Sequence, residues 1–586
     1  EAQLILRDTP GVTALVYDQQ CATEARRMRK RGLLPDRAER VVINELVCEG
    51  CGDCGRVSNC LSVQPVDTEF GRKTRIHQSS CNLDFSCLDG DCPSFITIVP
   101  SKKEDAPKFA IPQPPADLPV PPIPEIGDGH SIYLMGIGGT GVVTVNQLLA
   151  TAAAIEGRWV SGLDQLGLSQ KAGPVVSHLR VLSSQADVAN RVTTGKADTY
   201  LALDALIATE TRHLSVTSPD RTIAVVSTGV VPTGEMIRDH NVHFPGQTAI
   251  RGRIDVSTRA DRNVYIDALG IAEGLLRNHM TANVVAIGAA FQAGALPLTA
   301  ESIERAIELN GTAVALNIAA FRWGRAAVAL PGAVDTALAR RVVRQTPKPA
   351  QEDAGLPIDS RIDEMLAKVT LAPDVARLVR IRANELVAFQ DVKLARRYVA
   401  FVGRVAAREA QVAPNRHELS EAVARYLYKL MAYKDEYEVA RLHLDPRFAQ
   451  AVADQFPEGG RISYRLHPPM LRSLGMDEKL ELGEWFRPAF QTLYAMRRLR
   501  GTRLDPFGYA EVRRVERELV ADYASRIRAA TEQLSADTYD RVVELAALPD
   551  IIRGYEGIKL ANVERYREAL AALDRESLMP DIAAGD

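Results

Sequence analysis

The segment CEGCGDCGRVSNC, residues 48–60, begins the stretch of sequence that decides how this chain folds. Cys81, Cys87 and Cys92 follow it, so seven of the eight cysteines fall between residues 48 and 92. A disulfide framework is typical of small secreted domains, whereas this chain has 586 residues and shows no export signal. Clustered thiols in such a chain indicate a bound metal rather than disulfide bonds.

The spacing of these thiols points to iron–sulfur chemistry. Cys48, Cys51 and Cys54 form C-x2-C-x2-C, a short loop that can present three thiolates to three iron corners of a cubane. In bacterial ferredoxins such a run occurs twice, and the fourth cysteine of each run binds the other [4Fe-4S] cluster. The same rule predicts two ligand sets here. The first set is Cys48, Cys51, Cys54 and Cys92, and the second is Cys60, Cys81, Cys87 and, where a thiol is lacking, Asp84.

The second set departs from the ferredoxin pattern. A carboxylate holds iron less firmly than a thiolate, so we expect one labile iron and interconversion between [4Fe-4S] and [3Fe-4S] forms. The spacings before Cys60 and Cys92 are also longer than usual, and Leu61 replaces the usual proline. A single cluster therefore stays an alternative to two, and a zinc site with four ligands is the alternative to both. Cys21 stands apart and is expected to be an ordinary buried thiol.

Length and composition bound the rest of the molecule. A chain of 586 residues predicts three or four domains, and a net charge of −3 leaves no basic excess for binding nucleic acid. No apolar run reaches the length of a membrane span, and no signal peptide is visible, so we expect a cytoplasmic protein. The first residue is Glu1, and the opening stretch looks like the inside of a domain, so we interpret the chain as a fragment.

Shifts in composition divide the chain into regions. The fold class that we expect is multidomain α/β plus α, with a ferredoxin-like segment, a Rossmann-like α/β domain and a mainly helical C-terminal domain. The proline-rich and polar stretches between these domains are predicted to be linkers. The expected boundaries are 1–45 for an opening tail, 46–105 for the iron–sulfur segment, 106–130 for a linker, 131–340 for the α/β domain, 341–360 for a linker and 361–586 for the helical domain.

The α/β region alternates apolar runs with amphipathic helices, which predicts a layered domain with a largely parallel sheet. Thr299 is expected to cap a helix that ends at Asn310 and Gly311, where glycine favours a left-handed stop. The other expected elements are strands at Ser131–Met135, Tyr200–Leu203 and Thr222–Ser227 and a helix at Val142–Ile155.

A glycine-rich loop lies between the first strand and the first helix of this region. Its glycines let the backbone approach a pyrophosphate, and the helix N-terminus supplies N–H donors. The acid that NAD binding requires at the end of the second strand is poorly placed, because Glu156 precedes that strand and Asp164 comes late. Coenzyme A is an equally compatible ligand, and close helix–strand packing is the alternative role. The candidate residues are Gly136, Gly138, Gly139 and Gly141.

Several segments resemble a known family. In the α/β region, Gly136–Gly141, Gly167–Arg180, Ser227–Glu235 (STGVVPTGE) and Gly288–Pro297 (GAAFQAGALP) resemble the γ domain of pyruvate and indolepyruvate ferredoxin oxidoreductases. The cysteine segment Cys48–Phe95 is closely similar to the long fused bacterial indolepyruvate ferredoxin oxidoreductases. Residues 1–45 resemble the end of that family's thiamine-pyrophosphate domain, and Leu430–His443 (LMAYKDEYEVARLH) resembles its C-terminal domain.

The resemblance implies oxidative decarboxylation of an aryl 2-oxoacid, with coenzyme A accepting the acyl group and electrons leaving through iron–sulfur clusters to ferredoxin. It implies thiamine pyrophosphate with Mg on an N-terminal part of the same enzyme, outside this chain, and assembly into a homo-oligomer. It assigns no catalytic residue here. Two other functions stay open: an electron carrier with an NAD(P)-binding domain and no oxoacid chemistry, and a scaffold in which the cluster is purely structural.

Overall fold

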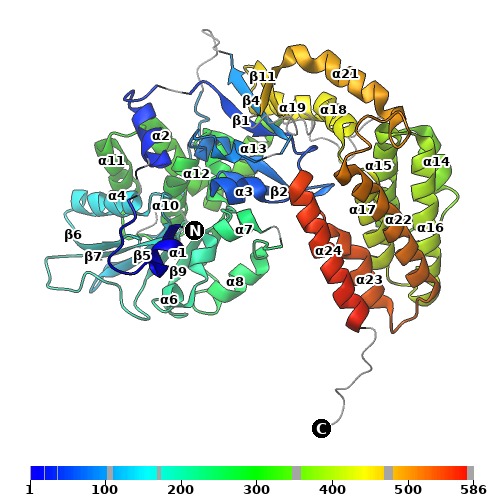
Figure 1. Ribbon diagram of the computed structural model, residues 1–586. Helices are drawn as coiled ribbons and strands as arrows, with labels where there is room; N and C mark the ends of the chain where they lie inside the picture. Colours follow the sequence, from blue (N-terminus) through cyan, green and yellow to red (C-terminus); the bar gives the residue numbers. More distant parts are fainter. Residues whose placement is uncertain are drawn as a thin grey trace.

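The protein consists of a small thiol-bearing segment that lies between an α/β unit and a helical unit (Figure 1). The structure is a computed structural model, and it describes residues 2–576 except 17, 19, 36, 91, 102–109, 168–172, 240, 346–357 and 467–478. In this part of the chain, no helix is both long enough and apolar enough to cross a bilayer.

The thiol segment, residues 40–100, is built from short elements around the cysteines. Two small helices precede it, and one hairpin separates Cys60 from Cys81. The elements of this part are α1 (Ala2–Asp8), α2 (Ala22–Lys30), β1 (Arg40–Ile43), α3 (Asp53–Ser58), β2 (Val63–Thr68), β3 (Gly71–Ile76), η1 (Gln78–Ser80), η2 (Ser86–Leu88) and β4 (Phe95–Pro100).

The α/β unit, residues 130–345, is a six-stranded sheet with helices on both faces. Its elements are β5 (His130–Ile137), α4 (Val142–Ile155), β6 (Trp159–Gln165), β7 (Pro174–Leu182), β8 (Thr199–Ala202), α5 (Ala205–Ala208), α6 (Thr211–Leu214), β9 (Ile223–Ser227), α7 (Gly234–Arg238), α8 (Gln247–Asp255), β10 (Val264–Ile266), α9 (Ala268–Leu276), η3 (His279–Thr281), α10 (Ala282–Gln292), α11 (Ala300–Asn310), α12 (Val314–Ala329) and α13 (Pro331–Gln345).

The expected, largely parallel sheet is confirmed, and among the described strands β7 is the one that runs against the other five. Strands β10, β9, β8 and β5 pair in parallel, but β7 and β6 extend the sheet in antiparallel fashion. Only eight residues, 166–173, join β6 to β7. That connection is too short for the crossover that parallel strands need, so the two strands run in opposite directions.

Several local predictions for this unit are confirmed. Helix α4 covers Val142–Ile155 as expected, and the expected strands match β5, β8 and β9 to within two residues at each end. The side chain of Thr299 accepts a hydrogen bond from the backbone N–H of Ser302 at the start of α11. Gly311 ends that helix with φ +69°, a conformation that glycine adopts at little cost.

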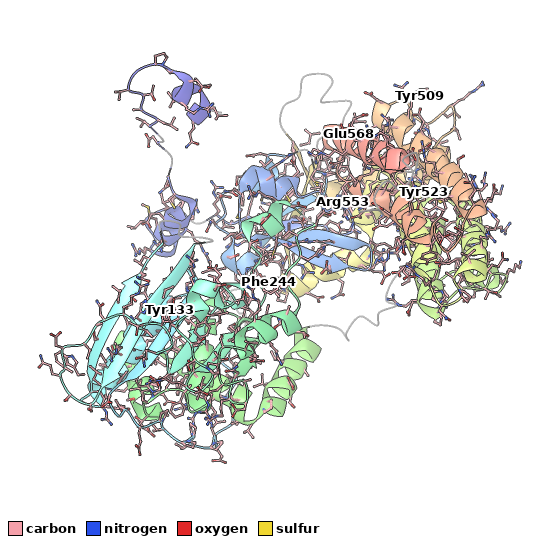
Figure 2. All side chains as sticks on the ribbon, turned by 90° about the horizontal axis from the view of Figure 1, so that it is seen from below. Tyr133, Phe244, Tyr509, Tyr523, Arg553 and Glu568 are labelled. Carbon is pink, nitrogen blue, oxygen red and sulfur yellow. The ribbon has the colours of Figure 1, made fainter. Side chains whose placement is uncertain are left out.

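The helical unit, residues 358–459 and 484–576, confirms the expected α-rich C-terminal region. Its elements are α14 (Ser360–Leu366), α15 (Pro373–Phe389), α16 (Val392–Val412), α17 (Glu418–Met431), α18 (Glu436–Leu444), α19 (Pro446–Gln455), η4 (Glu484–Phe486), α21 (Arg487–Ala495), η5 (Met496–Leu499), α22 (Glu511–Glu532), α23 (Tyr539–Ala547), η6 (Leu548–Ile551) and α24 (Glu556–Glu576). Tyr523, labelled in Figure 2, is buried in its core.

Two strands from the C-terminal part leave the helices and complete the sheet of the thiol segment. They are β11 (Gly460–Leu466) and β12 (Leu480–Gly483), and the antiparallel order is β1-β4-β11-β12. Ile96 and Ile98 of β4 are buried there against Tyr464 and Phe490. Sequence analysis places residues 46–105 in a separate segment, whereas their sheet is shared with residues far along the chain.

Two further expectations need correction or lie beyond the described residues. Cys21 is exposed rather than buried, because it precedes the short helix α2. Helix α13 continues to Gln345, into the expected linker 341–360, and residues 346–357 lie outside the described residues. The described part of the proline-rich linker packs on the α/β unit, where Pro112 and Pro119 accept hydrogen bonds through their carbonyl oxygens.

Candidate metal centre

The first thiol set is brought together by the pairing of β1 with β4. Ile43 lies opposite Phe95, and the backbone N–H of Asn44 donates to the carbonyl oxygen of Ser94 at 2.8 Å. The loop that follows β1 therefore lies beside the residue that precedes β4. As a result Cys48, Cys51, Cys54 and Cys92 line one cavity, as the spacing of the cysteines predicts.

Glycine is required at two places in the loop that carries the first three thiols. Gly50 has φ +63°, and a Cβ there would lie 2.2 Å from the carbonyl oxygen of Arg72. Gly52 has φ +76°, and its Cβ would lie 2.7 Å from the carbonyl oxygen of Arg238. The tight turn also lets the N–H of Gly50 donate to the sulfur of Cys48 at 3.3 Å. Such donors to sulfur tune the potential of iron–sulfur centres.

The thiols of the first set are close enough to influence one another. Burial, followed by the charge of Cys92, raises the pKa of Cys51 to about 12. Burial and the charge of Cys48 raise the pKa of Cys92 to about 11, although Ser94 lies 2.9 Å from its sulfur and opposes this. Several thiols in one place, three of them with a raised pKa, are costly to ionise without a cation. Bound iron would stabilise all four thiolates at once.

The second thiol set is assembled by the β2–β3 hairpin. Val63 pairs with Ile76, and the N–H of His77 donates to the carbonyl oxygen of Ser62 at 2.7 Å, so Cys60 before the hairpin lies near Cys81 after it. Burial, followed by the charges of Cys81 and Cys60, raises the pKa of Cys87 to about 12. The three thiols thus form a group of their own. Cys87 also contributes to the raised pKa of Cys54, which links the two groups.

Asp84 lies beside the second set. Its charge contributes to the raised pKa values of both Cys81 and Cys87, after burial and other causes. Asp84 is exposed, and its Oδ1 accepts hydrogen bonds from the hydroxyl and the backbone N–H of Ser86 at 3.2 and 3.4 Å. Leu83 and Phe85 on either side have φ +58° and +68°, a strained backbone for such residues. A role for Asp84 as an iron ligand stays a prediction.

The donor set suits a cluster. Within the described residues, no group of three or more His, Cys, Asp or Glu side chains is arranged to hold a single metal ion. In a cubane each thiolate binds its own iron atom, so its ligands stand further apart than those of one zinc ion. The chain provides two groups of buried or partly buried thiols, one with four members and one with three, and thiolates are the usual ligands of such clusters.

The helical unit holds the first thiol loop through its backbone. Lys434 donates from Nζ to the carbonyl oxygens of Val47 and Cys48 at 3.1 and 3.0 Å, and it pairs with Glu49 at 2.8 Å. Tyr555 donates from its hydroxyl to the carbonyl oxygen of Val47 at 2.5 Å. Sequence reasoning missed these residues, because their positions depend on long-range packing. Lys434 does lie within the LMAYKDEYEVARLH segment that carries the resemblance.

The α/β unit contacts the thiol segment on another side. Arg72 donates from its guanidinium to the carbonyl oxygens of Met236 and Val242 at 3.0 and 2.9 Å. His77 Nε2 lies 2.7 Å from a carboxylate oxygen of Glu273. These contacts fix the thiol segment to α7 and α9 and thus to both neighbouring units.

The structure gives packing roles to part of the glycine loop. A Cβ at Gly141, which has φ +84°, would lie 2.3 Å from Nδ2 of Asn283, and a Cβ at Gly136 would lie 2.6 Å from Oγ1 of Thr140. The N–H of Gly138 already donates to the carbonyl oxygen of Gly173 at 2.9 Å. These contacts favour close helix–strand packing for the two outer glycines. Binding of a pyrophosphate at Gly138 and Gly139 stays a prediction.

Comparison with known families covers two parts of the chain. Residues 131–327 match the family model described as pyruvate ferredoxin/flavodoxin oxidoreductase. This part of the chain is therefore similar to that oxidoreductase family. Residues 375–572, which form most of the helical unit, match a family of unknown function. The thiol segment precedes both matched ranges in the sequence.

Known relatives resemble this oxidoreductase domain. The chain is 24% identical over 202 residues to an indolepyruvate oxidoreductase subunit IorB of Methanothermobacter thermautotrophicus, a match that spans 34% of this chain and 98% of the relative. The Pyrococcus horikoshii subunit of the same name is 29% identical over 199 residues, which is 33% of this chain and 94% of the relative. Both relatives therefore correspond to about one third of the present chain.

Solved structures match the same third of the chain. The pyruvate oxidoreductase subunit PORC of Thermotoga maritima has 19% identity and a TM-score of 0.26, with 34% of this chain and 96% of that chain covered. The 2-oxoglutarate:ferredoxin oxidoreductase of Magnetococcus marinus has 17% identity and a TM-score of 0.27, with 34% and 31% covered.

Proposed function

We propose that this chain is the electron-output part of a 2-oxoacid:ferredoxin oxidoreductase of the indolepyruvate type. The observation that carries the proposal is the pair of thiol groups packed directly against an oxidoreductase domain of this family. Similarity to indolepyruvate oxidoreductase subunits supports the substrate class, an aryl 2-oxoacid. An electron carrier without oxoacid chemistry is less well supported, since the domain matches this oxidoreductase family.

The residues that would hold the clusters follow from the two groups. Cys48, Cys51, Cys54 and Cys92 would hold the first, and the second group would hold the other. When bound, such clusters accept and release single electrons, which coupling a two-electron oxidation to a one-electron carrier requires. The protein supplies a buried site whose backbone is held by Lys434 and Tyr555. Rigid ligands keep the geometry constant while the charge changes.

Other components of the reaction lie outside the residues assigned so far. In this proposal thiamine pyrophosphate and its Mg²⁺ bind a separate N-terminal part of the same enzyme, and residues 1–45 are the end of that part. Coenzyme A is the co-substrate that accepts the acyl group. The enzyme assembles as a homo-oligomer and works in the cytoplasm.

Ferredoxin would dock beside the second thiol group, which lies nearer to the surface. Helix α2 covers the loop that bears Cys81, where Arg26 and Arg29 donate to the carbonyl oxygens of Ser79 and Asn82 at 2.5 and 3.1 Å. The neighbouring residues Arg27, Arg31 and Arg37 are exposed. A cationic surface next to an electron-exit site favours an acidic redox partner by electrostatic steering.

Anaerobic iron and sulfide analysis combined with electron paramagnetic resonance tests the proposal. Protein purified without oxygen should contain close to two clusters' worth of iron and sulfide, and a low-potential donor should reduce it. A Cys51→Ser variant should lose the signal of one cluster. The exposed Cys21 lies outside both groups, so Cys21→Ser is the matched control and should keep all the iron.

Three outcomes would contradict the proposal. Zinc in place of iron would exclude the clusters, and clusters that a low-potential donor cannot reduce would favour the scaffold. Saturable binding of a nicotinamide dinucleotide would favour the electron carrier with an NAD(P) domain.

A further inference from the structure

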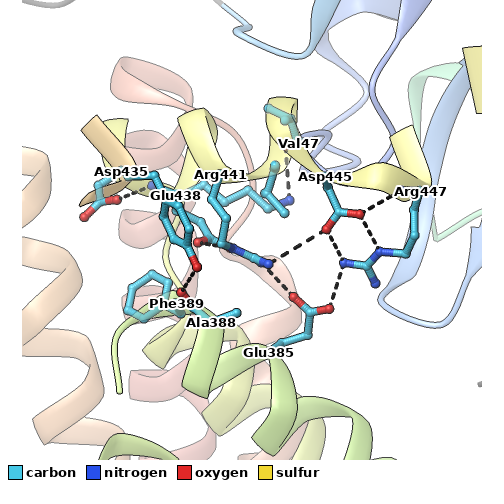
Figure 3. A network of polar contacts seen from close by, with 12 residues as sticks. Val47, Glu385, Ala388, Phe389, Asp435, Glu438, Arg441, Asp445 and Arg447 are labelled. Carbon is cyan, nitrogen blue, oxygen red and sulfur yellow. Dashed lines mark hydrogen bonds and ion pairs between the residues drawn. The ribbon is translucent and has the colours of Figure 1, made fainter. Parts of the chain in front are cut away.

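A second cavity lies between the thiol segment and the helical unit, and no cysteine of the described residues lines it. It has a volume of about 130 Å³. Its walls come from the loop after β1, from β3, from α15, α17 and α18, and from residues around Arg553. Figure 2 shows Arg553 at this boundary, and Figure 3 shows Glu385 and Arg441 in one of its walls. This volume is enough for a phosphate group.

The lining of this cavity is rich in charge. It contains eight lysine and arginine side chains and four carboxylates. Each of the four carboxylates already forms an ion pair with a basic side chain of the lining. Three acids outside the lining form ion pairs with arginines of the lining. The pairs in the lining are Glu49 with Lys434, Glu385 with Arg441 and Arg447, Glu438 with Arg441, and Asp550 with Arg553. The outer acids are Glu69 with Arg382, Glu421 with Arg425, and Asp445 with Arg447.

Three cationic side chains nevertheless keep unused donors. Lys73, in the middle of β3, is 7% exposed and has no hydrogen-bond or ion-pair partner among the described residues. Arg382 is 2% exposed, and its Nε has no acceptor, although its other nitrogens donate to Glu69. Nη1 of Arg441 also lacks a hydrogen bond and lies 3.9 Å from Asp445. A buried cation without a partner is costly, so these donors indicate an absent anion.

We propose that this cavity binds the phosphate group of a small anion, with Lys73, Arg382 and Arg441 as its donors. The three side chains come from three different elements, and a tetrahedral phosphate offers acceptor oxygens in several directions. A planar carboxylate offers only two oxygens. Guanidinium groups also bind phosphate in bidentate fashion.

The aromatic side chains in the lining are compatible with two sources of the phosphate group, a nucleotide and inorganic phosphate. Phe70, Tyr426 and Tyr428 line the cavity, and the ring centroids of Phe70 and Tyr428 lie 5.7 Å apart. Aromatic walls suit the base of a nucleotide, whereas the charged donors alone suffice for inorganic phosphate. Both sources share the same phosphate chemistry.

Isothermal titration calorimetry on the full chain, purified without oxygen in a phosphate-free buffer, tests the proposal. The probes are inorganic phosphate, AMP and, as a singly charged carboxylate, benzoate. We expect saturable binding of AMP or phosphate that weakens about tenfold or more in Lys73→Met, because a hydrogen bond to a charged group is lost. Tighter binding of AMP identifies a nucleotide, and equal binding identifies phosphate alone as sufficient.

Control variants separate binding from folding. Lys393→Met removes an exposed lysine on α16 and should leave the affinity unchanged. Lys73→Met replaces an unpaired buried charge with an apolar chain of similar length, so its thermal midpoint should not fall. Arg425→Gln at the exposed rim offers a second variant that puts no buried group at risk and should weaken binding as well. The proposal is overturned if neither phosphate compound binds saturably, if Lys73→Met binds as the wild type does, or if benzoate binds more tightly than both.

Discussion

At the scale of single residues, the cysteine spacing predicted which thiols the fold brings together in the first group. Cys48 and Cys92 lie far apart in sequence, yet the pairing of Ile43 with Phe95 places them at one cavity. The ferredoxin rule, in which the fourth thiol comes from the other cysteine run, predicts this proximity. It does so because it describes how two distant runs pack together, beyond the spacing within one loop. Asp84 has no such rule behind it, so its role needs a direct test.

Replacing Asp84 with cysteine tests whether this side chain binds iron. If it does, a fourth thiolate should hold the labile iron more firmly, and Asp84→Cys should lose less iron under mild oxidation. The measurement is the three-iron signal in electron paramagnetic resonance after timed exposure to ferricyanide. Asp89→Cys is the control, since Asp89 is also exposed but lies after Cys87. Equal iron loss in Asp84→Cys and wild type would mean that Asp84 is not a ligand.

His178 predicts a pH dependence for the α/β unit. It is buried on β7 against Tyr133, and burial followed by the nearby charge of Arg191 lowers its pKa to about 4. The unfolded chain takes up this proton near pH 6.5, so the free energy of unfolding should fall as pH drops from about 6.5 to about 4. The loss should reach up to about 3 kcal/mol.

Denaturant titrations at several pH values measure this effect. His178→Gln keeps a polar side chain but cannot titrate, so its stability should vary less over the same range. A wild-type profile that matches that of His178→Gln would show that another group controls the acid response.

At the scale of secondary-structure elements, α10 and α12 pack through glycines. A Cβ at Gly288 would lie 2.0 Å from the carbonyl oxygen of Phe321, and one at Gly324 would lie 2.0 Å from that of Val285. The two helix backbones therefore approach too closely for any side chain. Gly288 lies in the GAAFQAGALP segment, which resembles the γ domain in sequence. The sequence alone does not show that glycine is needed there for close helix packing.

A methyl group at Gly324 should force these helices apart. We expect Gly324→Ala to destabilise the α/β unit by about 1–3 kcal/mol, the usual cost of overpacking. Thermal unfolding followed by circular dichroism measures the change. Gly252→Ala in α8 is the control, because a Cβ there meets no atom within 4 Å and should stabilise the helix slightly. Equal midpoints for the two variants would argue against the close packing.

Sequence patterns predicted individual helices and strands better than they predicted which strands pair and which distant residues are in contact. The periodicity of Val142–Ile155 and the cap at Thr299 depend on neighbouring residues, so α4 and α11 could be predicted. The antiparallel β6 and β7 and the strands β11 and β12 could not be placed, since pairing depends on distant residues. Lys434 and Tyr555 were missed for the same reason.

At the scale of the whole molecule, the sheet β1-β4-β11-β12 joins the thiol segment to the C-terminal part of the chain. Strands β11 and β12 contribute Tyr464 and Leu482 to a core that also contains Ile96. The thiol segment is therefore not an independent unit, although its cysteines are contiguous in sequence.

Removing the C-terminal part tests this dependence. A chain that ends at residue 345 keeps all the cysteines but lacks β11, β12 and the Lys434 and Tyr555 contacts. We expect it to retain little iron after anaerobic reconstitution, with exposed apolar surface and aggregation. Residues 110–345 alone should remain folded, because the core of the α/β unit is its own. Full iron content in the shortened chain would contradict this dependence.

The shared sheet also sets an order of events during translation. The thiols leave the ribosome early, but Gly460–Leu466 and Leu480–Gly483, which close the sheet beside them, are made more than 360 residues later. At about 5–20 residues per second, roughly 20–70 s separate the two events. During that interval the nascent thiols are exposed to oxygen and stray metals. If they bind clusters as proposed, iron has to be delivered late or the growing chain has to be protected.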